Sequence, residues 1–549
     1  MTAKIKTLHD YAAAAGIREI PAFFSSLGLF PGTNRSLYEH QIGDLAHLVK
    51  HLPRPKLFNE PGTGKTNPAQ ALTLLLKGWG NKTVWLVPSA MVEQFTRAFS
   101  TNFGPGLDSH ATIEHLGLDI ARRRKQLARF EAGEWPDVLV TSYALFTGKT
   151  TVLREVRKRG QDGKPRTVKV RSTEPLYQGG EVTPENFSWA ALKARGYTFC
   201  GLDEAQNAKN ADTNLWRALN RFVGDDGGML PMTATPLDTN LEDAYGVIAL
   251  CDRTAYGSKR AFDRKHVILD PNARKRVGER LLPYRKVVAY QNQALLHKNL
   301  YAGARRILKK DVLDMPPKVV TELQLTLSPP HRKIYDKLVE ERMLEIGERL
   351  VDATEATALY QATQRILLNP DSYAEKPIRP NVLLDTIDAL VDGLGGRKVL
   401  VYAWYRESVE ALARHLHALN PVTLYGGTAP ADRDRNRMKF IQDPDCRALI
   451  ANFKSGGAGV DGLQEVCSHA IYAEVCPWGG AFFQSTDRLW RSGQKEAVNI
   501  YLLVPRNTVA VKLRNDLVKK DKAANEVMRD SRAVLADLMG RQGLQGALT

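Results

Sequence analysis

Two shortages narrow the functions open to this chain: cysteine is scarce, and long apolar runs are missing. The 549 residues include five cysteines, an odd number, and no Cys-x-x-Cys pair. This count disfavours a disulfide framework and a zinc ribbon, and it fits a reducing compartment. No stretch approaches the roughly 20 apolar residues of a membrane span, and the N-terminal stretch has no apolar run of signal-peptide type. We therefore expect a soluble, cytoplasmic protein with no membrane partner.

Positive charge is what the chain has in excess. Lysine and arginine number 77 against 60 acidic residues, a formal net charge of +17. This balance favours a polyanionic partner, with nucleic acid ahead of a membrane surface. A basic surface that only aids solubility is the alternative. At a prior of about 150 residues per domain, the length predicts roughly three or four structural units.

Short apolar runs alternate with helical patterns in two separate zones of the chain. The runs begin at Thr83, Asp137, Tyr197 and Gly228 in the first zone, and at Lys398, Pro421, Arg447, His469 and Val498 in the second. Runs this apolar are typical of strands buried on both faces of a parallel sheet. The alternation predicts the α/β class, with two doubly wound parallel-sheet domains.

Two segments interrupt this alternation. The segment from 241 to 380 is rich in arginine and lysine and is broken by two Pro-Pro pairs, so we expect a helical insertion followed by a linker. The segment 154–173 has eight basic residues against two acidic ones, a net charge of +6, and its Gln-Asp-Gly predicts the turn of a basic hairpin. A solvated loop is an equal alternative for that segment.

These patterns give a predicted division of the chain. The boundaries are an N-terminal extension over 1–36, a first domain over 37–240 with the basic insertion at about 150–196, the helical insertion and linker over 241–380, a second domain over 381–515, and a helical C-terminal tail over 516–549.

The stretch from Asn59 to Thr66, Asn-Glu-Pro-Gly-Thr-Gly-Lys-Thr, has the residue types of a phosphate-binding loop. Glycines let backbone N–H groups point at phosphate oxygens, a lysine neutralises charge, and a hydroxyl holds Mg²⁺. A helix that begins here would add the positive end of its dipole, and Pro68 is tolerated in its first turn. The strict pattern has glycine where Asn59 stands, so a glycine-rich turn remains the alternative.

Asp203 and Glu204 follow an apolar run, at the carboxyl end of a strand where ligands of α/β sheets bind. One carboxylate can hold Mg²⁺, and its neighbour can orient and deprotonate an attacking water. A solvated acidic pair at the end of a strand is the common alternative. The phosphate-loop pattern about 140 residues upstream favours the catalytic interpretation.

The stretch Gln-Ser-Thr-Asp-Arg-Leu-Trp-Arg-Ser-Gly-Gln, from Gln484 onward, carries two arginines. On a helix, Gln484, Arg488 and Arg491 would share one face. Two arginines that face one way, far along the chain, are what an arginine finger from a second domain requires. An exposed basic helix face is the alternative, and it is the better interpretation of this stretch taken alone.

Taken in order, these motifs resemble the SWI/SNF-type DNA-dependent ATPases of helicase superfamily two. The resemblance rests on LYEHQ, NEPGTGKT, WLVPS, TSY, LDEAQ, MTATPL, VLVYAWY, NFKSGGAGVDGLQ and QSTDRLWRSGQ, and it covers roughly 37 to 513. The segment from Pro316 is similar to a linker of that group. The resemblance implies two RecA-like domains that bind ATP and Mg²⁺ between them.

The resemblance also implies a role for each matching residue. Gln41 would read the adenine, and Gly62, Thr63, Gly64, Lys65 and Thr66 would bind the phosphates. Thr66 and Asp203 would hold Mg²⁺, Glu204 would act as the base, and Arg488 and Arg491 would be arginine fingers with Gln484 nearby. Gly459 and Asp461 would touch both ATP and the nucleic-acid strand. The phosphodiester backbone would be gripped by Pro88, Ser89, Thr141, Ser142 and Tyr143. Thr233 and Thr235 would couple ATP to nucleic acid.

Three positions depart from the pattern of that family. Gln206 stands where the family has histidine, which puts the coupling in doubt, and Asp461 replaces a common asparagine. Trp490 occupies part of a usual Ala-His pair, and we expect it to pack on the core rather than on a base.

The resulting expectation is ATP hydrolysis coupled to movement on, or remodelling of, duplex or branched DNA. Contacts to phosphates predict binding that is largely independent of sequence and sensitive to salt. An RNA helicase of the same superfamily and a non-catalytic nucleic-acid-binding scaffold are the alternatives. Because no chromatin-reading module is recognisable beside the motor motifs, a bacterial or viral protein is favoured, and we expect a monomer.

Overall fold

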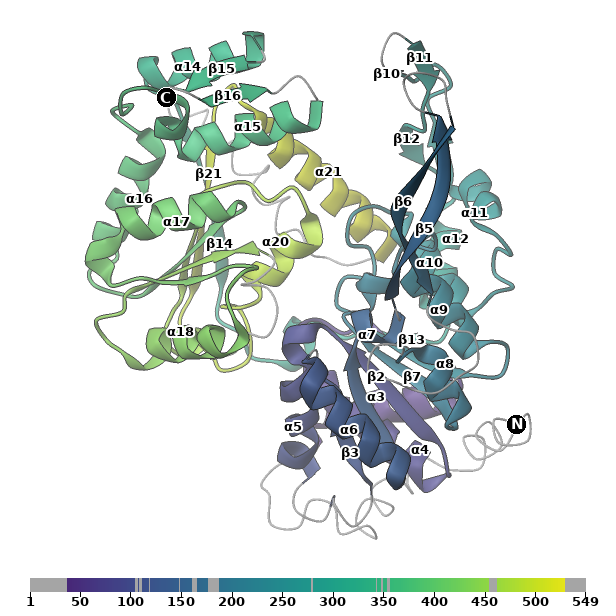
Figure 1. The fold of residues 1–549 in the computed structure, drawn as a ribbon. Coiled ribbons are helices and arrows are strands. Elements are labelled where there is room, and N and C mark those ends of the chain that lie inside the picture. Colours follow the sequence, from purple (N-terminus) through teal and green to yellow (C-terminus); the bar gives the residue numbers. More distant parts are fainter. Residues whose placement is uncertain are drawn as a thin grey trace. The chain divides into compact units, whose positions relative to one another are not determined.

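The computed structural model describes residues 37–103, 107, 111–117, 119–147, 149–159, 165–175, 187–277, 280–341, 343–346, 349–352, 356–453 and 462–528. This part of the chain forms two compact units (Figure 1). Unit 1 comprises the described residues up to Leu237 together with Glu242–Leu308. Unit 2 comprises Asp238–Leu241 and the described residues from Lys309 onward.

Unit 1 is built on a seven-stranded parallel sheet with the order β13-β1-β8-β7-β2-β4-β3. Its strands are β1 (Lys56–Leu57), β2 (Lys82–Val87), β3 (Ile113–His115), β4 (Val138–Ser142), β7 (Tyr197–Asp203), β8 (Gly228–Met232) and β13 (Ala304–Arg305). The four apolar runs of the first zone form β2, β4, β7 and β8, which confirms the prediction. Their residues are almost all buried, as expected for strands covered on both faces.

Helices pack on this sheet and bury two apolar cores. The first core includes side chains of α3 (Glu39–Lys50), α4 (Thr66–Gly78) and α5 (Val92–Phe103). The second includes side chains of α6 (Ile120–Ala132), α7 (Tyr143–Thr147), α8 (Trp189–Ala194), α9 (Asn214–Val223) and α10 (Asp243–Cys251). In α5 the buried residues Val92, Phe95, Phe99 and Phe103 recur at helical spacing, so one stripe of the helix faces the core.

Unit 2 is built on a six-stranded parallel sheet with the order β14-β21-β20-β17-β19-β18. Its strands are β14 (Lys318–Leu325), β17 (Val399–Ala403), β18 (Val422–Leu424), β19 (Ala448–Asn452), β20 (His469–Tyr472) and β21 (Val498–Pro505). All five apolar runs of the second zone form strands here. The two parallel sheets confirm the predicted doubly wound α/β class.

One large apolar core holds unit 2 together. Its helices are α13 (Lys309–Val312), α14 (Pro329–Glu341), α15 (Ala356–Leu368), α16 (Val382–Gly393), α17 (Arg406–His415), α18 (Pro430–Gln442), α20 (Gly479–Thr486) and α21 (Val509–Met528). Helix α17 is one of the helices that alternate with the strands of this sheet, as the helical patterns between the apolar runs predict. Of the predicted tail over 516–549, the described residues up to Met528 are helical, and the remainder lies outside the described residues, as does the extension over 1–36.

The segment 241–380, expected to be a helical insertion and linker, is divided between the two units and contains strands. In unit 1 it forms α11 (Lys259–His266), α12 (Gln293–Tyr301) and the strands β9 (Val267–Leu269), β10 (Arg274–Val277), β11 (Arg280–Pro283) and β12 (Val287–Tyr290). In unit 2 it forms β14 and the pair β15 (Met343–Ile346) and β16 (Arg349–Asp352). The apolar-run criterion misses β14 because this edge strand is only half buried.

The basic segment forms two antiparallel strands, β5 (Lys149–Arg159) and β6 (Pro165–Pro175), with Arg154 opposite Val170. This pairing confirms the predicted hairpin, and its turn lies outside the described residues. The strands extend from unit 1 as a long two-stranded ribbon (Figure 1).

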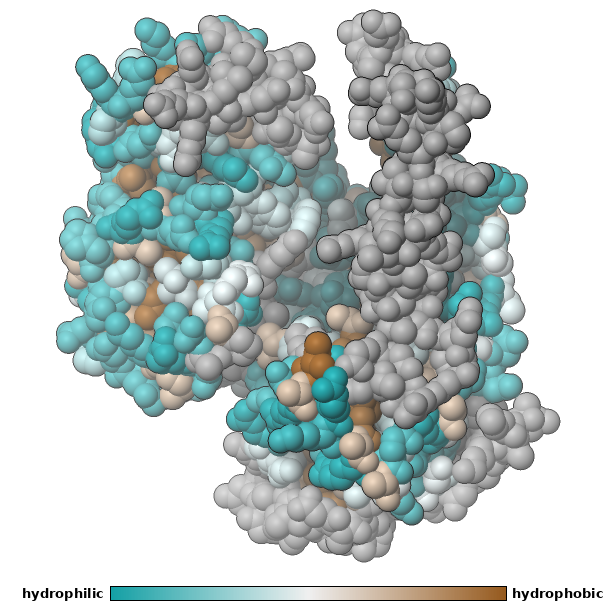
Figure 2. Space-filling model, in the orientation of Figure 1, coloured by the Kyte–Doolittle hydropathy of each residue, from teal (hydrophilic) through white to brown (hydrophobic). Residues whose placement is uncertain are grey.

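Surface and cysteine chemistry agree with the composition. Hydrophilic side chains cover most of the described surface on the face drawn in Figure 2. All five cysteines are buried and unpaired with one another, so the chain has no disulfide. None of the described helices combines the length and apolarity needed to cross a bilayer.

Candidate functional site

The predicted phosphate loop connects β1 to the first turn of α4, which begins at Thr66. Gly62 and Gly64 have φ of 84° and 79°, a region that glycine adopts without steric cost. A Cβ atom at Gly64 would also lie 2.2 Å from Nε2 of Gln41, so a larger residue there would displace the Gln41 amide. The N-terminus of the 13-residue α4 supplies N–H groups that suit an anion. Pro68 lies in its first turn, as predicted.

Side chains close this loop from inside. The Nζ of Lys65 donates to the carbonyl oxygens of Asn59 and Glu60 at 3.0 and 3.2 Å. The Thr63 hydroxyl donates to the carbonyl oxygen of Glu60 at 2.8 Å. The side chain of Lys65 therefore folds back onto the loop in which its charge is expected to neutralise phosphate.

Gln41 is buried against the phosphate loop. Its Nε2 lies 3.4 Å from the carbonyl oxygen of Thr63 and 3.3 Å from that of Gly64. Its Oε1 accepts from the backbone N–H of Tyr38 at 3.1 Å. These contacts tie α3 to the loop, while the role of Gln41 toward adenine stays a prediction.

Asn59, which departs from the strict glycine pattern, has a structural role. Its Nδ2 donates to Oδ2 of Asp44 at 2.6 Å, and Nε of Arg305 lies 3.3 Å from Oδ1 of the same carboxylate. Asn59 and Asp44 are both completely buried. Burial raises the pKa of Asp44 above its ordinary value, and the nearby Arg305 opposes that rise. The asparagine thus satisfies a buried carboxylate, which glycine could not do.

Asp203 ends β7, and Glu204 follows it in a left-handed conformation with φ and ψ of 56°. Such a conformation is unfavourable for a side chain like glutamate, and in folded proteins it concentrates at functional sites. The hydroxyl of Tyr143 donates to the backbone oxygen of Asp203 at 2.6 Å. Burial and the carboxylate of Asp203 hold the pKa of Tyr143 well above its ordinary value, so the phenol remains a neutral donor.

A chain of hydrogen bonds leads from Glu204 to the segment after β8. Nε2 of Gln206 donates to Oε2 of Glu204 at 2.8 Å, and the hydroxyl of Thr233 donates to Oε1 of Gln206 at 2.6 Å. The backbone N–H of Thr235 then donates to the hydroxyl of Thr233 at 3.0 Å. Glutamine, having both a donor and an acceptor, therefore bridges this relay where histidine was expected.

The residues predicted to grip a phosphodiester backbone differ in accessibility. Ser89, which begins η1 (Ser89–Met91), is exposed, and Pro88 is half-buried. Thr141 and Ser142 end β4 and are buried, with the Ser142 hydroxyl accepting from the N–H of Leu145 at 3.4 Å. Thr233 and Thr235 are buried as well. A direct contact with nucleic acid is therefore simplest for Ser89.

In unit 2 the prediction of one continuous helix face is wrong. Gln484 lies on α20, but the helix ends at Thr486, and Arg488 and Arg491 lie in the turns that follow. Two side chains take the carbonyl oxygens that a longer helix would use: Lys309 bonds that of Trp490 at 2.7 Å, and Gln494 bonds that of Leu489 at 3.3 Å. All three predicted polar side chains, Gln484, Arg488 and Arg491, are half-buried.

Trp490 packs on the core of unit 2, as predicted. Its indole Nε1 donates to the carbonyl oxygen of Pro316 at 2.8 Å. The ammonium groups of Lys309 and Lys318 lie 4.8 and 4.3 Å from its ring centroid, distances typical of cation–π contacts. Gly459 and Asp461, the remaining predicted site residues, lie outside the described residues.

Sequence reasoning missed the residues that support these motifs. Arg306 donates through Nη1 to the carbonyl oxygen of Phe58 at 2.5 Å and to that of Ala234 at 3.3 Å. Lys309 is fully buried and donates to Oδ1 of Asp487 at 2.8 Å. Both basic residues belong to Ala-Arg-Arg-Ile-Leu-Lys-Lys, a stretch whose pattern is that of any solvated basic segment. Only their bonding partners in the folded chain distinguish Arg306 and Lys309 from ordinary solvated basic residues.

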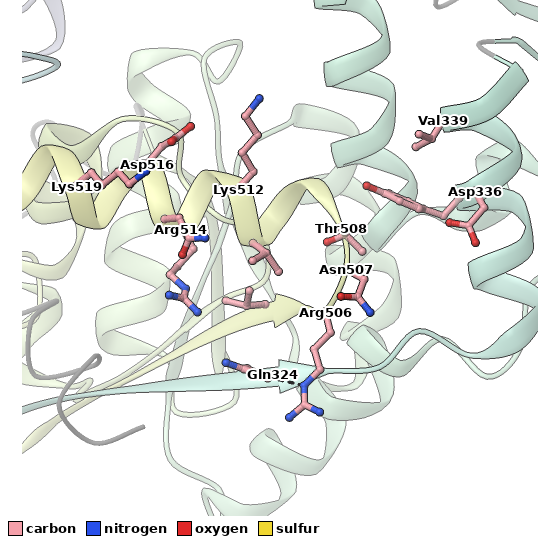
Figure 3. A pocket seen from close by; sticks show the side chains of 14 residues that line it. Gln324, Asp336, Val339, Arg506, Asn507, Thr508, Lys512, Arg514, Asp516 and Lys519 are labelled. Carbon is pink, nitrogen blue, oxygen red and sulfur yellow. Dashed lines mark hydrogen bonds between the residues drawn. The ribbon is translucent and has the colours of Figure 1, made fainter. Parts of the chain in front are cut away.

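An open pocket of about 970 Å³ lies in unit 2 between α14, the end of β21 and α21 (Figure 3). Its lining includes the basic residues Arg506, Lys512, Arg514 and Lys519 and the acidic residues Asp336 and Asp516. Arg514 and Arg506 are already engaged, by Glu322 at 3.0 Å and by Gln324 at 3.1 Å. The mixed charge selects no single class of ligand, and none of the predicted site residues lines this pocket.

The donor set also limits the metal. Within the described ranges, no group of three or more His, Cys, Asp or Glu residues is placed to hold a metal ion. A metal at the phosphate loop would rely on one carboxylate, one hydroxyl and other oxygen donors. That set fits Mg²⁺, which binds few protein ligands and keeps waters or phosphates.

Comparisons with known proteins show a family and several relatives that this chain resembles. A family model described as the SNF2-related domain matches residues 40–371. The putative ATP-dependent helicase/translocase YwqA of Bacillus subtilis (strain 168) is 24% identical over 525 residues, covering 91% of this chain and 49% of the relative. The transcription regulatory protein SNF2 of Saccharomyces cerevisiae is 23% identical over 507 residues, covering 86% of this chain and 26% of the relative.

The chain spans about half, or less, of the length of these relatives. Among solved structures, the Sulfolobus solfataricus SWI2/SNF2 ATPase core in complex with dsDNA aligns with a TM-score of 0.35 at 17% identity, covering 90% of this chain and 94% of that one.

Proposed function

The chain belongs to the family of the SNF2-related domain, and from this premise we propose that it is an ATP-driven motor that acts on double-stranded or branched DNA. One observation carries the proposal. The phosphate loop, the pair Asp203–Glu204 and the segment from Thr233 follow β1, β7 and β8, which are neighbours in one parallel sheet. Ligands of such sheets bind beyond the carboxyl ends of the strands, so all three motifs face one binding edge.

ATP would bind with its phosphates on the backbone N–H groups of Gly62–Thr66 and at the N-terminus of α4. Lys65 would exchange the carbonyl oxygens of Asn59 and Glu60 for the β- and γ-phosphates. Thr66 and Asp203 would hold Mg²⁺, whose charge offsets that of the phosphates when it is bound. Gln41 would contact the adenine from the position in which its amide already braces the loop.

Glu204 would orient the attacking water and accept its proton as the bond to the γ-phosphorus forms. Gln206 bonds Oε2 of this carboxylate and so fixes its orientation. The relay through Thr233 to Thr235 would carry the change in charge at Glu204 to the end of β8. Arg488 and Arg491 of unit 2, with Gly459 and Asp461, would complete the ATP site, because arginines stabilise the charge of the transferring phosphoryl group.

The DNA contacts would be made mainly with phosphates. A net charge of +17 and the basic hairpin β5–β6 supply the attraction. Pro88, Ser89, Thr141, Ser142 and Tyr143 lie at the ends of β2 and β4, the strands that follow β7 in the order of the sheet. We place the DNA backbone along this edge, with the exposed Ser89 as its first contact.

The decisive experiment is ATP turnover measured with duplex, single-stranded, forked and four-way-junction DNA and with RNA. We expect duplex or branched DNA to stimulate hydrolysis most. Lys65→Ala should abolish turnover and weaken ATP binding, whereas Glu204→Gln should keep binding and lose hydrolysis. Lys50→Ala, at an exposed lysine that ends α3, is the matched control and should behave like the wild type.

Each alternative predicts a different outcome. Stimulation by RNA rather than DNA would identify an RNA helicase. Absence of turnover with every nucleic acid, combined with tight binding to DNA, would identify a non-catalytic scaffold. Either result would overturn the proposed motor.

A further inference from the structure

The chain passes between its two units at short segments. It passes from unit 1 to unit 2 after Leu237, returns after Leu241, and passes again after Leu308. We call Asp238–Leu241 the first strap and Arg305–Lys309 the second strap. The first strap begins three residues after Thr235 and bonds α20 of unit 2. The second strap bonds the start of the phosphate loop in unit 1 and ends at Lys309, which bonds Asp487 and Trp490 in unit 2.

The second strap begins as a backbone ladder against the phosphate loop. The N–H of Phe58 donates to the carbonyl oxygen of Arg305 at 2.8 Å, and the N–H of Glu60 donates to that of Ile307 at 2.9 Å. Arg306 adds its bonds to the carbonyl oxygens of Phe58 and Ala234. The strap therefore contacts the start of the phosphate loop and the segment between Thr233 and Thr235 at once.

Two residues further on, the same strap is fixed in unit 2. Lys309 has no exposed surface, and its ammonium group bonds Oδ1 of Asp487 at 2.8 Å and the carbonyl oxygen of Trp490 at 2.7 Å. Asp487 precedes Arg488, and Trp490 precedes Arg491. The Lys309 ammonium group thus bonds residues directly before Arg488 and Arg491. We call Asp487–Arg491 the arginine segment.

The first strap reaches the helix that leads into the arginine segment. The carbonyl oxygen of Asp238 accepts from the N–H of Gly480 at 3.3 Å. A Cβ atom at Gly480 would lie 1.7 Å from Oδ1 of Asp238, whereas one at Gly479 would meet only ordinary contacts, the nearest at 3.6 Å from Leu517. Gly480 therefore leaves room for the side chain of Asp238, which lies three residues after Thr235.

We propose that the two straps set the arginine segment according to the state of the phosphate loop, with Lys309 as a positioning residue for Arg488 and Arg491. An extended chain spans at most about 3.3–3.6 Å per residue. Ile307 and Lys309 are two residues apart, so their backbones are never more than about 7 Å from each other. Because so little chain separates them, a shift of Glu60 that moves Ile307 would pull on Lys309, and through it on the turns that follow α20. This inference rests on the proposed ATPase function.

The rival explanation is that Lys309 only stabilises unit 2. A buried ion pair is costly to break, so removing one partner can by itself loosen a fold. The two explanations differ in where the effect is felt. Loosening of unit 2 changes its melting temperature, whereas loss of the strap lowers kcat and leaves ATP binding at unit 1 intact.

The test compares Lys309→Met with Lys310→Met, a control at the exposed neighbouring lysine, in the full chain with duplex DNA. We expect kcat of Lys309→Met to fall about 100-fold, the effect of misplacing a catalytic group by about 1 Å, while KM for ATP stays within threefold. Lys309→Met/Asp487→Asn, which leaves no lone buried carboxylate, should remain equally slow. Recovery of kcat in this double variant would overturn the proposal.

Gly480→Ala and Gly479→Ala form a second matched pair that leaves the buried ion pair intact, and it decides the matter if Lys309→Met fails to fold. Both changes favour the helix equally by propensity, but only the first displaces Asp238. We expect Gly480→Ala to lower kcat by roughly tenfold, within the range of measured coupling effects, and Gly479→Ala to match the wild type. Equal kcat in the two variants would overturn the role of the first strap.

Amide hydrogen exchange without nucleotide tests the straps independently of hydrolysis. Lys309→Met should speed exchange in peptides over 484–494 and also over 58–66, because the ladder to Glu60 loses its fixed end. Faster exchange confined to 484–494, or none beyond that of Lys310→Met, would refute the strap. A wild type without ATP turnover would refute the proposed function alone, since the exchange result would still decide the strap.

Discussion

Units 1 and 2 hold their predicted catalytic side chains in different ways. In unit 1, Asp203 is the last residue of the buried strand β7 and Thr233 directly follows the buried strand β8, so the strands fix where these residues lie. In unit 2, Arg488 and Arg491 lie in irregular turns that Lys309 fixes from a distant part of the chain. The difference shows that a sequence pattern predicts local geometry well next to a buried strand. It predicts that geometry poorly where side chains from distant parts of the chain bond the backbone.

The largest expected effect is on the rate of ATP hydrolysis, and it should distinguish a residue of unit 2 from a residue of unit 1. Arg491→Ala should slow hydrolysis by about a thousandfold, the scale of an arginine finger, and leave ATP affinity near that of the wild type. Lys65→Ala should lose both. Turnover and nucleotide binding are measured together, with the exposed Lys495→Ala as control. A large loss of ATP affinity in Arg491→Ala would place this arginine in binding rather than in catalysis.

A second effect concerns the buried carboxylate of unit 2. Glu474 accepts from the Ser408 hydroxyl at 2.6 Å and from the backbone N–H groups of Trp404 and Tyr405 at 2.5 and 3.2 Å. Burial raises its pKa from 4.5 to about 7 in spite of these donors. Because the folded pKa lies above the unfolded value, the folded state binds the extra proton, and stability falls as pH rises from about 4.5 to about 7.

Glu474→Gln should remove this pH dependence, which amounts to about 3 kcal/mol. Urea unfolding followed at several pH values between 4 and 8 measures it. The control is Glu465→Gln, which changes an exposed carboxylate on η6 (Leu463–Glu465). An unchanged slope in Glu474→Gln would show that another group titrates in this window.

In unit 1 the buried carboxylate of Asp44 accepts from Asn59 and lies beside Arg305, so its dependence on the amide donor can be tested directly. Asn59→Gly restores the strict phosphate-loop pattern but removes a donor from Asp44, at a cost of about 1–3 kcal/mol. The hydrogen bond from Asn59 favours the ionised form, so the cost of removing it should be full at neutral pH and shrink in acid. Thermal unfolding at pH 7 and pH 4 checks both points. Asn59→Ala separates loss of the amide from the backbone freedom of glycine, and equal stability of all three proteins would refute the role of Asn59.

The smallest effect concerns the basic hairpin, which lies outside both parallel sheets. Changing Arg157, Lys158, Arg159, Lys164 and Arg166 together to Ser should weaken DNA binding. For every phosphate that the variant no longer neutralises, the log–log salt dependence should flatten by roughly 0.9 on duplex DNA. ATP turnover without DNA should persist, since unit 1 keeps Lys65 and Glu204. An unchanged salt slope together with unchanged DNA stimulation would show that the hairpin does not touch DNA.

The sequence was sufficient for the strands β2, β4, β7, β8, β17, β18, β19, β20 and β21, and for the glycine-rich turn at Gly62 and Gly64. Those strands are buried on both faces, so the hydrophobic effect alone selects their residues, and a continuous apolar run reports it. The residues of the edge strand β14 are half-buried or exposed, so its sequence has no continuous apolar run. The helix predicted through Arg491 failed because propensity is weak beside tertiary bonds: Lys309 is 178 positions from Asp487, and no local pattern shows that the two meet.

The site itself divides in the same way. The residue types around Gly62 and Gly64 follow from the backbone angles that the loop adopts, which the structure bears out. By contrast, Asn59 and Gln206 looked like defects when compared with a family pattern. Each makes a hydrogen bond to a residue that is not its neighbour in the sequence. Asn59 donates to Asp44, and Gln206 accepts from Thr233. A departure from a pattern is therefore better judged against its partners than against the pattern.

The left-handed backbone of Glu204 has a consequence for protein engineering. Among the described residues other than glycine, only Glu204, Asn292, Asn420 and Asn507 have positive φ, and asparagine is one of the few residues that tolerate it. Glutamate does so at a cost of about 1–2 kcal/mol. A library selected for heat resistance alone should therefore replace Glu204 early, with glycine or asparagine. A library selected for ATP turnover should keep glutamate. The residue found at position 204 would therefore show whether a variant was selected for stability or for turnover.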